Sequence, residues 1–187
     1  MHGIVSLLDR DHYKLVEDIW AGLEDSLGLR GVYVTPFPHF SYHVADHYDV
    51  ELLEPVLRDF AAETAPFEVL TTGLGIFTAG LNPIIYINVA RSPQLSRLNG
   101  KLWPLLTEAS TGIVEYYHPE QWVPHITLGQ GDVTTENLAE SIRVLSRWDF
   151  TWQIPVDNIA LLYSQGNGQQ DLIRYRFPLT GTEQGVD

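Results

Sequence analysis

The stretch PHFSYH, residues 38–43, returns in similar form as PHITLG, residues 124–129. In both, a Pro-His pair is followed by one apolar residue and then by a hydroxyl residue. The two histidines, His39 and His125, stand 86 positions apart, so that each half of the 187-residue chain contains one copy. A four-residue pattern arises easily by chance, but two copies at matching places in a repeated layout favour a shared function.

The spacing within each copy predicts how the side chains point. In a β-strand, residues i and i+2 lie on the same face, so His39 is expected beside Ser41 and His125 beside Thr127. The apolar residues between them then enter the core. If the two strands face each other, two imidazoles and two hydroxyls line one cleft.

The elements around the two copies also repeat. Apolar residues at spacings of three and four predict four helices, and short apolar or alternating runs predict seven strands. The expected helices cover 9–27, 49–65, 92–106 and 134–147. The expected strands cover 3–8, 40–44, 67–78, 83–90, 122–128, 151–163 and 172–179, and 32–34 is expected to lead into the first motif.

The order strand, helix, motif strand, helix, strand, strand therefore occurs twice. This predicts an α+β fold that is a bilobal, pseudo-twofold duplication, in which each lobe is an antiparallel sheet with covering helices and the motif strands face a central cleft. We expect residues 1–187 to form a single bilobal domain with lobes at about 1–80 and 81–187, and we allow exchange of a strand or helix between them.

The composition limits the kind of ligand. The chain has 11 Lys and Arg residues against 24 Asp and Glu residues, a formal charge of −13. Binding to long nucleic acids depends on phosphate neutralisation by Lys and Arg, so this balance favours a small ligand. The chain has no cysteine, which excludes disulfides and suits the cytoplasm. The run at residues 3–8 ends at Asp9 with no basic region before it, so we expect neither a signal peptide nor a membrane span there.

Two histidines in one cleft suit a phosphodiester. In-line displacement at phosphorus needs a base on the attacking oxygen and an acid on the leaving oxygen, and an imidazole titrates near pH 6.5 and fills either role. His39 and His125 are therefore the expected catalytic pair. The hydroxyls of Ser41 and Thr127 are expected to donate hydrogen bonds to the non-bridging oxygens.

Other polar residues follow the motifs. His43 falls on the same strand face as His39 if the alternation continues, and it is expected at the rim of the substrate site rather than in catalysis. Gln130 follows the second motif and is expected to contact substrate. No His-Glu-x-x-His pattern occurs, and the His pairs near residue 43 lie in a strand, so we expect no metal and no cofactor. The aromatic residues Tyr33, Phe37 and Trp122 are candidates for stacking on a base.

The paired PHFS and PHIT elements resemble the two signatures of the two-histidine phosphoesterases, which include cyclic nucleotide phosphodiesterases and bacterial 2′-5′ RNA ligases. The resemblance extends over nearly the whole chain, including LLYS at 161–164. It implies metal-independent chemistry on 2′,3′-cyclic or 2′-5′ phosphodiesters. Members that act on RNA often have an Arg after the second motif, where this chain has Gln130 and Asp132.

The sequence thus predicts a monomeric cytoplasmic phosphodiesterase that hydrolyses 2′,3′-cyclic or related cyclic phosphates on nucleotides or short RNA ends. Two alternatives stay open. One is an RNA-end enzyme that joins or opens 2′-5′ linkages. The other is a protein that grips a nucleotide phosphate without turnover.

Overall fold

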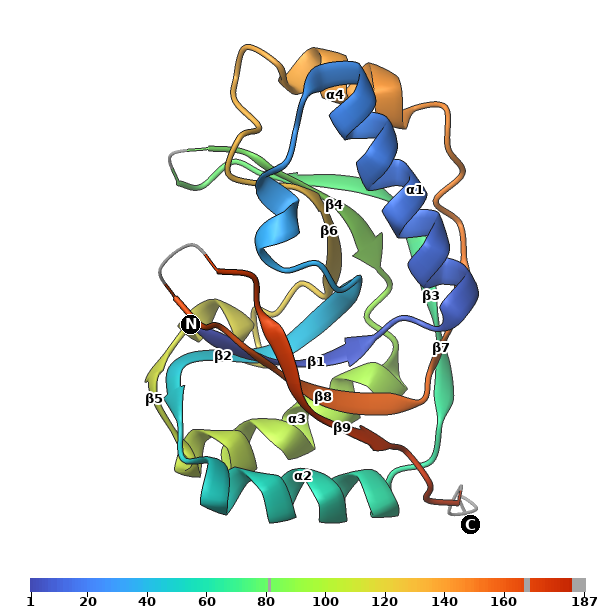
Figure 1. Ribbon diagram of the computed structural model, residues 1–187. Coiled ribbons are helices and arrows are strands. Elements are labelled where there is room, and N and C mark those ends of the chain that lie inside the picture. The colour runs from blue at the N-terminus through green and yellow to red at the C-terminus, as the bar shows by residue number, and fades with distance from the viewer. Residues whose placement is uncertain (81, 167–168, 183–187) are drawn as a thin grey trace.

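The computed structural model describes residues 1–80, 82–166 and 169–182 and shows an α+β protein (Figure 1). Its strands form one antiparallel sheet in the order β7-β3-β4-β6-β2-β1-β8-β9, and the short β5 pairs with β2. The strands are β1 (His2–Leu7), β2 (His39–Tyr48), β3 (Phe67–Phe77), β4 (Ile84–Val89), β5 (Ser110–Ile113), β6 (His125–Gly129), β7 (Gln153–Val156), β8 (Asn158–Tyr163) and β9 (Leu172–Pro178).

Four helices and two 3₁₀ turns pack around this sheet in the described residues. They are α1 (Arg10–Leu27), α2 (Val50–Glu63), α3 (Pro93–Glu108) and α4 (Leu138–Leu145), with 3₁₀ turns η1 (Gly31–Val34) and η2 (Glu115–Tyr117). Helix α1 contacts α4 and β6, whereas α2 contacts β8 and β9 and α3 contacts β2 and β5. Figure 1 accordingly shows α1 and α4 together at one end of the molecule and α2 and α3 at the other.

The sheet is curled rather than flat. Strand β7 forms one edge and β8 lies next to the opposite edge, yet Asp157 alone separates these two strands along the chain. A connection of one residue cannot span a flat sheet, so the two edges must approach each other. The result is the half-barrel in Figure 1, with the β2–β6 junction in its middle.

Helix α1 illustrates how the sequence sets these elements. Asp9 caps its N-terminus by accepting hydrogen bonds from the backbone of Asp11 and His12, and Gly28 ends it in the left-handed region with φ of 71°. The buried side chains Val16, Ile19, Trp20 and Leu23 recur at spacings of three and four. Burial of each such side chain contributes roughly 1.5–3 kcal/mol, which fixes the apolar face of the helix against the sheet.

The structure departs from the expected elements in three places. The run at 151–163 is two strands that join opposite sides of the sheet, since periodicity does not reveal a change of partner. Residues 32–34 form the turn η1 rather than extended chain, and the strand at 110–113 was not expected. In the described ranges, no helix combines the length and the apolar character needed to cross a bilayer.

Candidate active site

The two motif strands lie next to each other in the sheet. Strands β2 and β6 pair antiparallel, with Phe40 opposite Ile126. Phe40 and Tyr42 are each 1% exposed, and Ile126 and Leu128 are 0% and 1% exposed, so the apolar positions of both motifs enter the core. The prediction that each motif strand buries its apolar face is confirmed.

The register of this pairing arranges the polar positions. With Phe40 opposite Ile126 in an antiparallel pair, His39 stands opposite Thr127 and Ser41 stands opposite His125. The two histidines are then diagonal neighbours, whose Cα atoms in such pairs are about 7–8 Å apart. Each imidazole therefore has the hydroxyl of the other motif as its direct neighbour across the junction.

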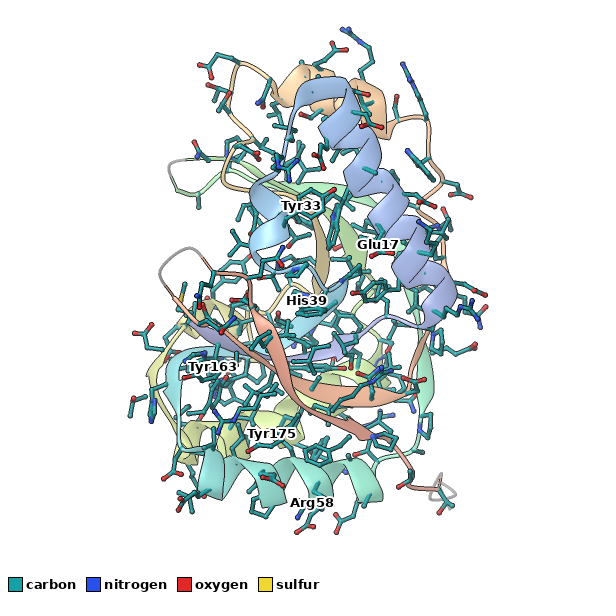
Figure 2. All side chains as sticks on the ribbon, in the orientation of Figure 1. Glu17, Tyr33, His39, Arg58, Tyr163 and Tyr175 are labelled. Carbon is teal, nitrogen blue, oxygen red and sulfur yellow. The ribbon has the colours of Figure 1, made fainter. Side chains whose placement is uncertain are left out.

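These four side chains line one cavity of about 250 Å³, and Gln130 lines it as well. Strands β1, β2, β6 and β8 contribute to its walls together with α1 and η1. Figure 2 shows His39 near the middle of the molecule, between Tyr33 of η1 and Tyr163 of β8. The structure thus brings together five of the six residues that the sequence predicts for the site.

Both imidazoles are held in the same way. Nδ1 of His39 lies 2.5 Å from the carbonyl oxygen of Phe37, and Nδ1 of His125 lies 2.7 Å from that of Val123. A carbonyl oxygen only accepts hydrogen bonds, so Nδ1 carries the proton and donates in each ring. In the neutral ring Nε2 is then an acceptor, ready to take a proton from a ligand in the cavity.

Burial disfavours the charged form of both rings. It lowers the pKa of His39 to about 4, the hydrogen bond to Phe37 opposes this shift, and the charge of His125 lowers the pKa further. Burial also lowers the pKa of His125, although less far, and the bond to Val123 opposes it. Without ligand both imidazoles are therefore neutral at pH 7, and a bound anion is needed to favour the protonated form of either one.

His43 lies outside the cavity, and the expectation that it shares a face with His39 and Ser41 is wrong. In the pairing of β1 with β2, Ile4 is opposite His43 and Val5 is opposite Ser41. Tyr42 therefore has no partner residue on β1 and forms a β-bulge. A bulge interrupts the alternation, and His43 turns into the core with 0% exposure. Its Nδ1 lies 2.6 Å from the hydroxyl of Tyr48, and its ring packs on Trp103.

The second motif contains the matching bulge. In the pairing of β4 with β6, Tyr86 is opposite Thr127 and Ile85 is opposite Gly129, so Leu128 is the extra residue. Gly129, like His43, is buried. The next residue of each strand, Gln130 on the second motif and Val44 on β2, lines the cavity again. The repeat therefore extends from the motif residues to the backbone irregularity that follows them.

Four further polar residues line the cavity and were not predicted: His2, Thr35, Tyr117 and Asp171. His2 accepts the backbone N–H of Ser164 at Nδ1 and stacks on Tyr163. Burial raises the pKa of the Tyr117 phenol to about 12, which keeps it a hydrogen-bond donor at neutral pH. These residues come from segments distant in sequence, and no local pattern marks them.

The three aromatic residues considered for stacking on a base make contacts within the protein. Trp122 is 1% exposed and donates its indole N–H to the carbonyl of Ser41. Tyr33 packs edge-on against Trp20, and Phe37 packs against a small apolar cluster. Trp122 is therefore part of the core and offers no face to a base.

Within the part of the chain that the structure describes, no group of three or more acidic or His residues could hold a metal ion.

Solved structures define the class of fold. Protein TT0787 of Thermus thermophilus superposes with a TM-score of 0.66 at 17% identity, over 97% of this chain and 99% of that one. Escherichia coli LigT, solved in complex with NADP+, superposes with a TM-score of 0.56 at 15% identity, over 96% of each chain. The curled antiparallel sheet with its helices is therefore the LigT-like fold.

The sequence comparisons identify the family. The model of the 2′-5′ RNA ligase superfamily matches residues 9–168. A Bacillus thuringiensis (strain Al Hakam) protein named "putative phosphoesterase" is 31% identical over 158 residues, which are 83% of this chain and 86% of that protein. A similarly named Bacillus cereus (strain B4264) protein is 30% identical over the same shares. The chain belongs to the 2′-5′ RNA ligase superfamily of two-histidine phosphoesterases, and the resemblance seen in its motifs is confirmed.

Proposed function

We propose that this protein is a phosphodiesterase that hydrolyses 2′,3′-cyclic or related cyclic phosphates of nucleotides or short RNA ends without a metal ion. The observation that carries the proposal is the pair of imidazoles, His39 and His125, in one cavity, each with Nδ1 engaged by a carbonyl and Nε2 left for the substrate. Two such groups supply the base and the acid that in-line displacement at phosphorus requires.

The reaction proceeds by transfer of two protons. One neutral imidazole takes a proton from water at Nε2 while the water oxygen forms its bond to phosphorus. The other imidazole, protonated at Nε2, gives that proton to the ribose oxygen as the P–O bond of the ring breaks. The phosphate monoester leaves, and a proton exchange with solvent restores both rings.

The two pKa shifts favour one assignment of these roles. The pKa of His39 is lowered further than that of His125, so His125 holds a proton more readily when an anionic phosphate enters. We therefore assign His125 as the general acid and His39 as the general base. Ser41 and Thr127, each beside one imidazole, donate to the non-bridging oxygens, where charge increases in the transition state.

The proposal includes the bilobal description of the fold. The β2–β6 junction has the strands β4, β3 and β7 on one side and β1, β8 and β9 on the other. Each side contributes one His, one hydroxyl and one bulge, which supports a pseudo-twofold axis through the junction. Helix α1, from the N-terminal half, covers β6, and β8, from the C-terminal half, pairs with β1, so the lobes exchange elements.

The cavity supports a small substrate. Its volume of about 250 Å³ is slightly below the ~300 Å³ at which pockets for drug-sized ligands begin. Among the described residues that line it, none is Lys or Arg, the side chains that follow a polynucleotide backbone. Gln130 lies in the wall as a neutral hydrogen-bonding group for the substrate. The NADP+ in the LigT structure supports a nucleotide as ligand.

The test is an assay of 2′,3′-cyclic nucleotides in the presence of EDTA. His39→Ala and His125→Ala are each expected to lower kcat by ~10² or more, the usual contribution of an acid–base group. His47→Ala is the matched control, because His47 is exposed at the far end of β2. Turnover within a few-fold of wild type in either motif variant would contradict the assignment, and so would loss of turnover on addition of EDTA.

The family match favours RNA-end joining as a second candidate. With a 5′-hydroxyl in place of water, the same two proton transfers would join the ends: the 5′-oxygen bonds to phosphorus as one imidazole takes its proton, and the P–O3′ bond of the cyclic phosphate breaks as the other imidazole protonates the 3′-oxygen, which leaves a 2′-5′ linkage. Joined product from oligonucleotides with these ends, and binding that weakens steeply with salt, would support it. A cyclic nucleotide that stays bound and intact would indicate a binding protein instead. Since one chain provides both motifs, we propose a monomer, and the absence of cysteine suits the cytoplasm.

A further inference from the structure

Asp171 introduces a negative charge into a cavity proposed to bind an anion. Its backbone N–H donates to the carbonyl of Val34, and its Oδ2 accepts from the hydroxyl of Thr35 at 2.5 Å. These two bonds fix the residue, which lies just before β9, against the end of η1. Asp171 lines the same cavity as His39 and His125.

No Lys or Arg among the described lining residues balances this carboxylate. Among the described residues that line the cavity, Asp171 is the one carboxylate and no Lys or Arg is present. Met1 also lines the cavity, but it is 70% exposed, so water screens its amino group. Oδ1 of Asp171 is buried and has no hydrogen-bond partner among the described residues. The side chain of Asp171 is half-buried, and the field of its charge acts on whatever else enters the cavity.

The charge of Asp171 reaches the reacting centre. It raises the pKa of His39, against the larger effect of burial, so the carboxylate acts electrostatically on that imidazole. A phosphate held by His39 and its neighbours is therefore also within reach of this charge. The interaction is repulsive, and it increases with the number of charges on the phosphate.

Substrate and product differ in that number. A phosphodiester carries one negative charge, whereas a phosphate monoester has a second pKa near 6 and carries almost two charges above pH 7. Hydrolysis of a cyclic diester yields such a monoester. A fixed negative charge therefore disfavours the product more than the substrate, which is specificity by repulsion.

We propose that Asp171 is a specificity-determining residue that admits monoanionic phosphodiesters to the cavity and disfavours dianionic monoesters, so that the hydrolysis product is released. The inference rests on the proposed phosphodiesterase function. It concerns binding, however, and is tested without turnover.

The experiment measures equilibrium binding by calorimetry at pH 7.5. The two probes are adenosine 3′-monophosphate and its O-methyl ester, which share base and sugar and differ by one charge. Wild type is expected to bind the ester at least about tenfold more tightly. In Asp171→Asn, which keeps an acceptor for Thr35, the monoester is expected to bind about tenfold more tightly than in wild type, with the ester changed by less than threefold.

Two control variants separate charge from structure. Thr35→Val removes the hydroxyl that Asp171 accepts from but keeps the carboxylate, which the backbone bond to Val34 still holds in place, so the preference for the ester should persist. Asp59→Asn removes the same charge from the exposed face of α2 and should change neither affinity. Melting temperatures of all variants show whether a change in binding follows a change in folding.

Several results would overturn the proposal. These are equal tightening of both probes in Asp171→Asn, unchanged affinities in that variant, the same loss of preference in Thr35→Val, or no binding of either probe by wild type. Selective binding without turnover of the cyclic nucleotide would instead support the role of Asp171 and contradict the proposed hydrolysis, so the two failures are distinguishable.

Discussion

Trp20 and Trp122 make the same hydrogen bond to the two motif strands. Nε1 of Trp20 donates to the carbonyl of Thr127 at 3.1 Å, and Nε1 of Trp122 donates to the carbonyl of Ser41 at 2.9 Å. Each of these carbonyls belongs to the residue just before a bulge, which is at Tyr42 on β2 and at Leu128 on β6. A bulge disrupts the regular ladder of backbone hydrogen bonds. The two indoles come from unrelated elements, α1 and the segment before β6, and each donates to the carbonyl next to a bulge.

Loss of either indole N–H is therefore expected to destabilise the site. Trp20→Phe and Trp122→Phe each leave a carbonyl beside the motif unpaired, which costs about 1–3 kcal/mol of the free energy of unfolding, and turnover falls with it. Urea unfolding measures the first effect. Trp152→Phe is the control, since its N–H bonds to Asp149 at an exposed position, and its cost should be below ~1 kcal/mol. Equal costs in all three variants would argue against a special role for the motif carbonyls.

The hydroxyls of the motifs are expected to matter for binding the phosphate. Ser41→Ala and Thr127→Val each remove one donor to a charged oxygen, and kcat/KM should fall about 10- to 100-fold. Because the two motifs use different hydroxyl residues in equivalent places, Ser41→Thr and Thr127→Ser form a matched pair that keeps the donor. These exchanges should retain kcat/KM within a few-fold, and a loss as large as in the deletions would show that shape, not the hydroxyl, is required.

The alternation of residues predicted correctly which motif side chains face the cavity, because it depends only on strand geometry. His39 with Ser41 and His125 with Thr127 face the cavity, and the apolar residues between them enter the core. The repeated spacing also predicted most helices and strands. These features follow from local periods of two and 3.6 residues, which a sequence displays directly.

The missed features depend on contacts between distant segments. The bulge at Tyr42 turns His43 into the core. The stretch PHFSYH gives no sign of this extra residue, because the bulge exists only in the pairing of β2 with β1. Asp171 reaches the cavity because its backbone bonds to Val34, 137 positions earlier in the chain. The division of 151–163 into two strands likewise depends on the curl of the sheet, which brings its edges together.

The buried His43 predicts loss of stability in acid. Burial lowers the pKa of this ring to about 4 in the folded protein, against 6.5 in the unfolded chain. Above pH 6.5 the ring is neutral in both states and contributes nothing to the pH dependence. From pH 6.5 down to 4 the unfolded chain takes up the proton and the folded protein does not, so the free energy of unfolding falls, by up to ~3 kcal/mol.

Substitution of the ring tests this account. His43→Phe loses the bond to Tyr48 and is expected to be less stable at pH 8, but its stability should fall less steeply than that of wild type between pH 6.5 and 4. His39 has a similarly lowered pKa and contributes its own share to the slope, so part of the dependence remains. His47→Gln replaces an exposed histidine of the same strand and serves as the matched control. An identical slope in wild type and His43→Phe would rule out this source of acid sensitivity.

If His39 and His125 form the proposed acid–base pair, their lowered pKa values predict an acidic optimum for kcat/KM. The productive form has one neutral and one protonated imidazole, so it is most populated between the pKa of His39, about 4, and that of His125, which burial lowers from 6.5. We expect kcat/KM to peak below pH 6.5 and to decline as pH rises through the pKa of His125.

A bound phosphate anion raises both pKa values, so kcat should peak at higher pH than kcat/KM. Asp171→Asn removes a charge that raises the pKa of His39, and the acidic limb should then move to lower pH. If kcat/KM instead climbs through pH 6.5 to a plateau near pH 8, the essential base titrates at or above its ordinary value, and His39 in its buried position is not that base.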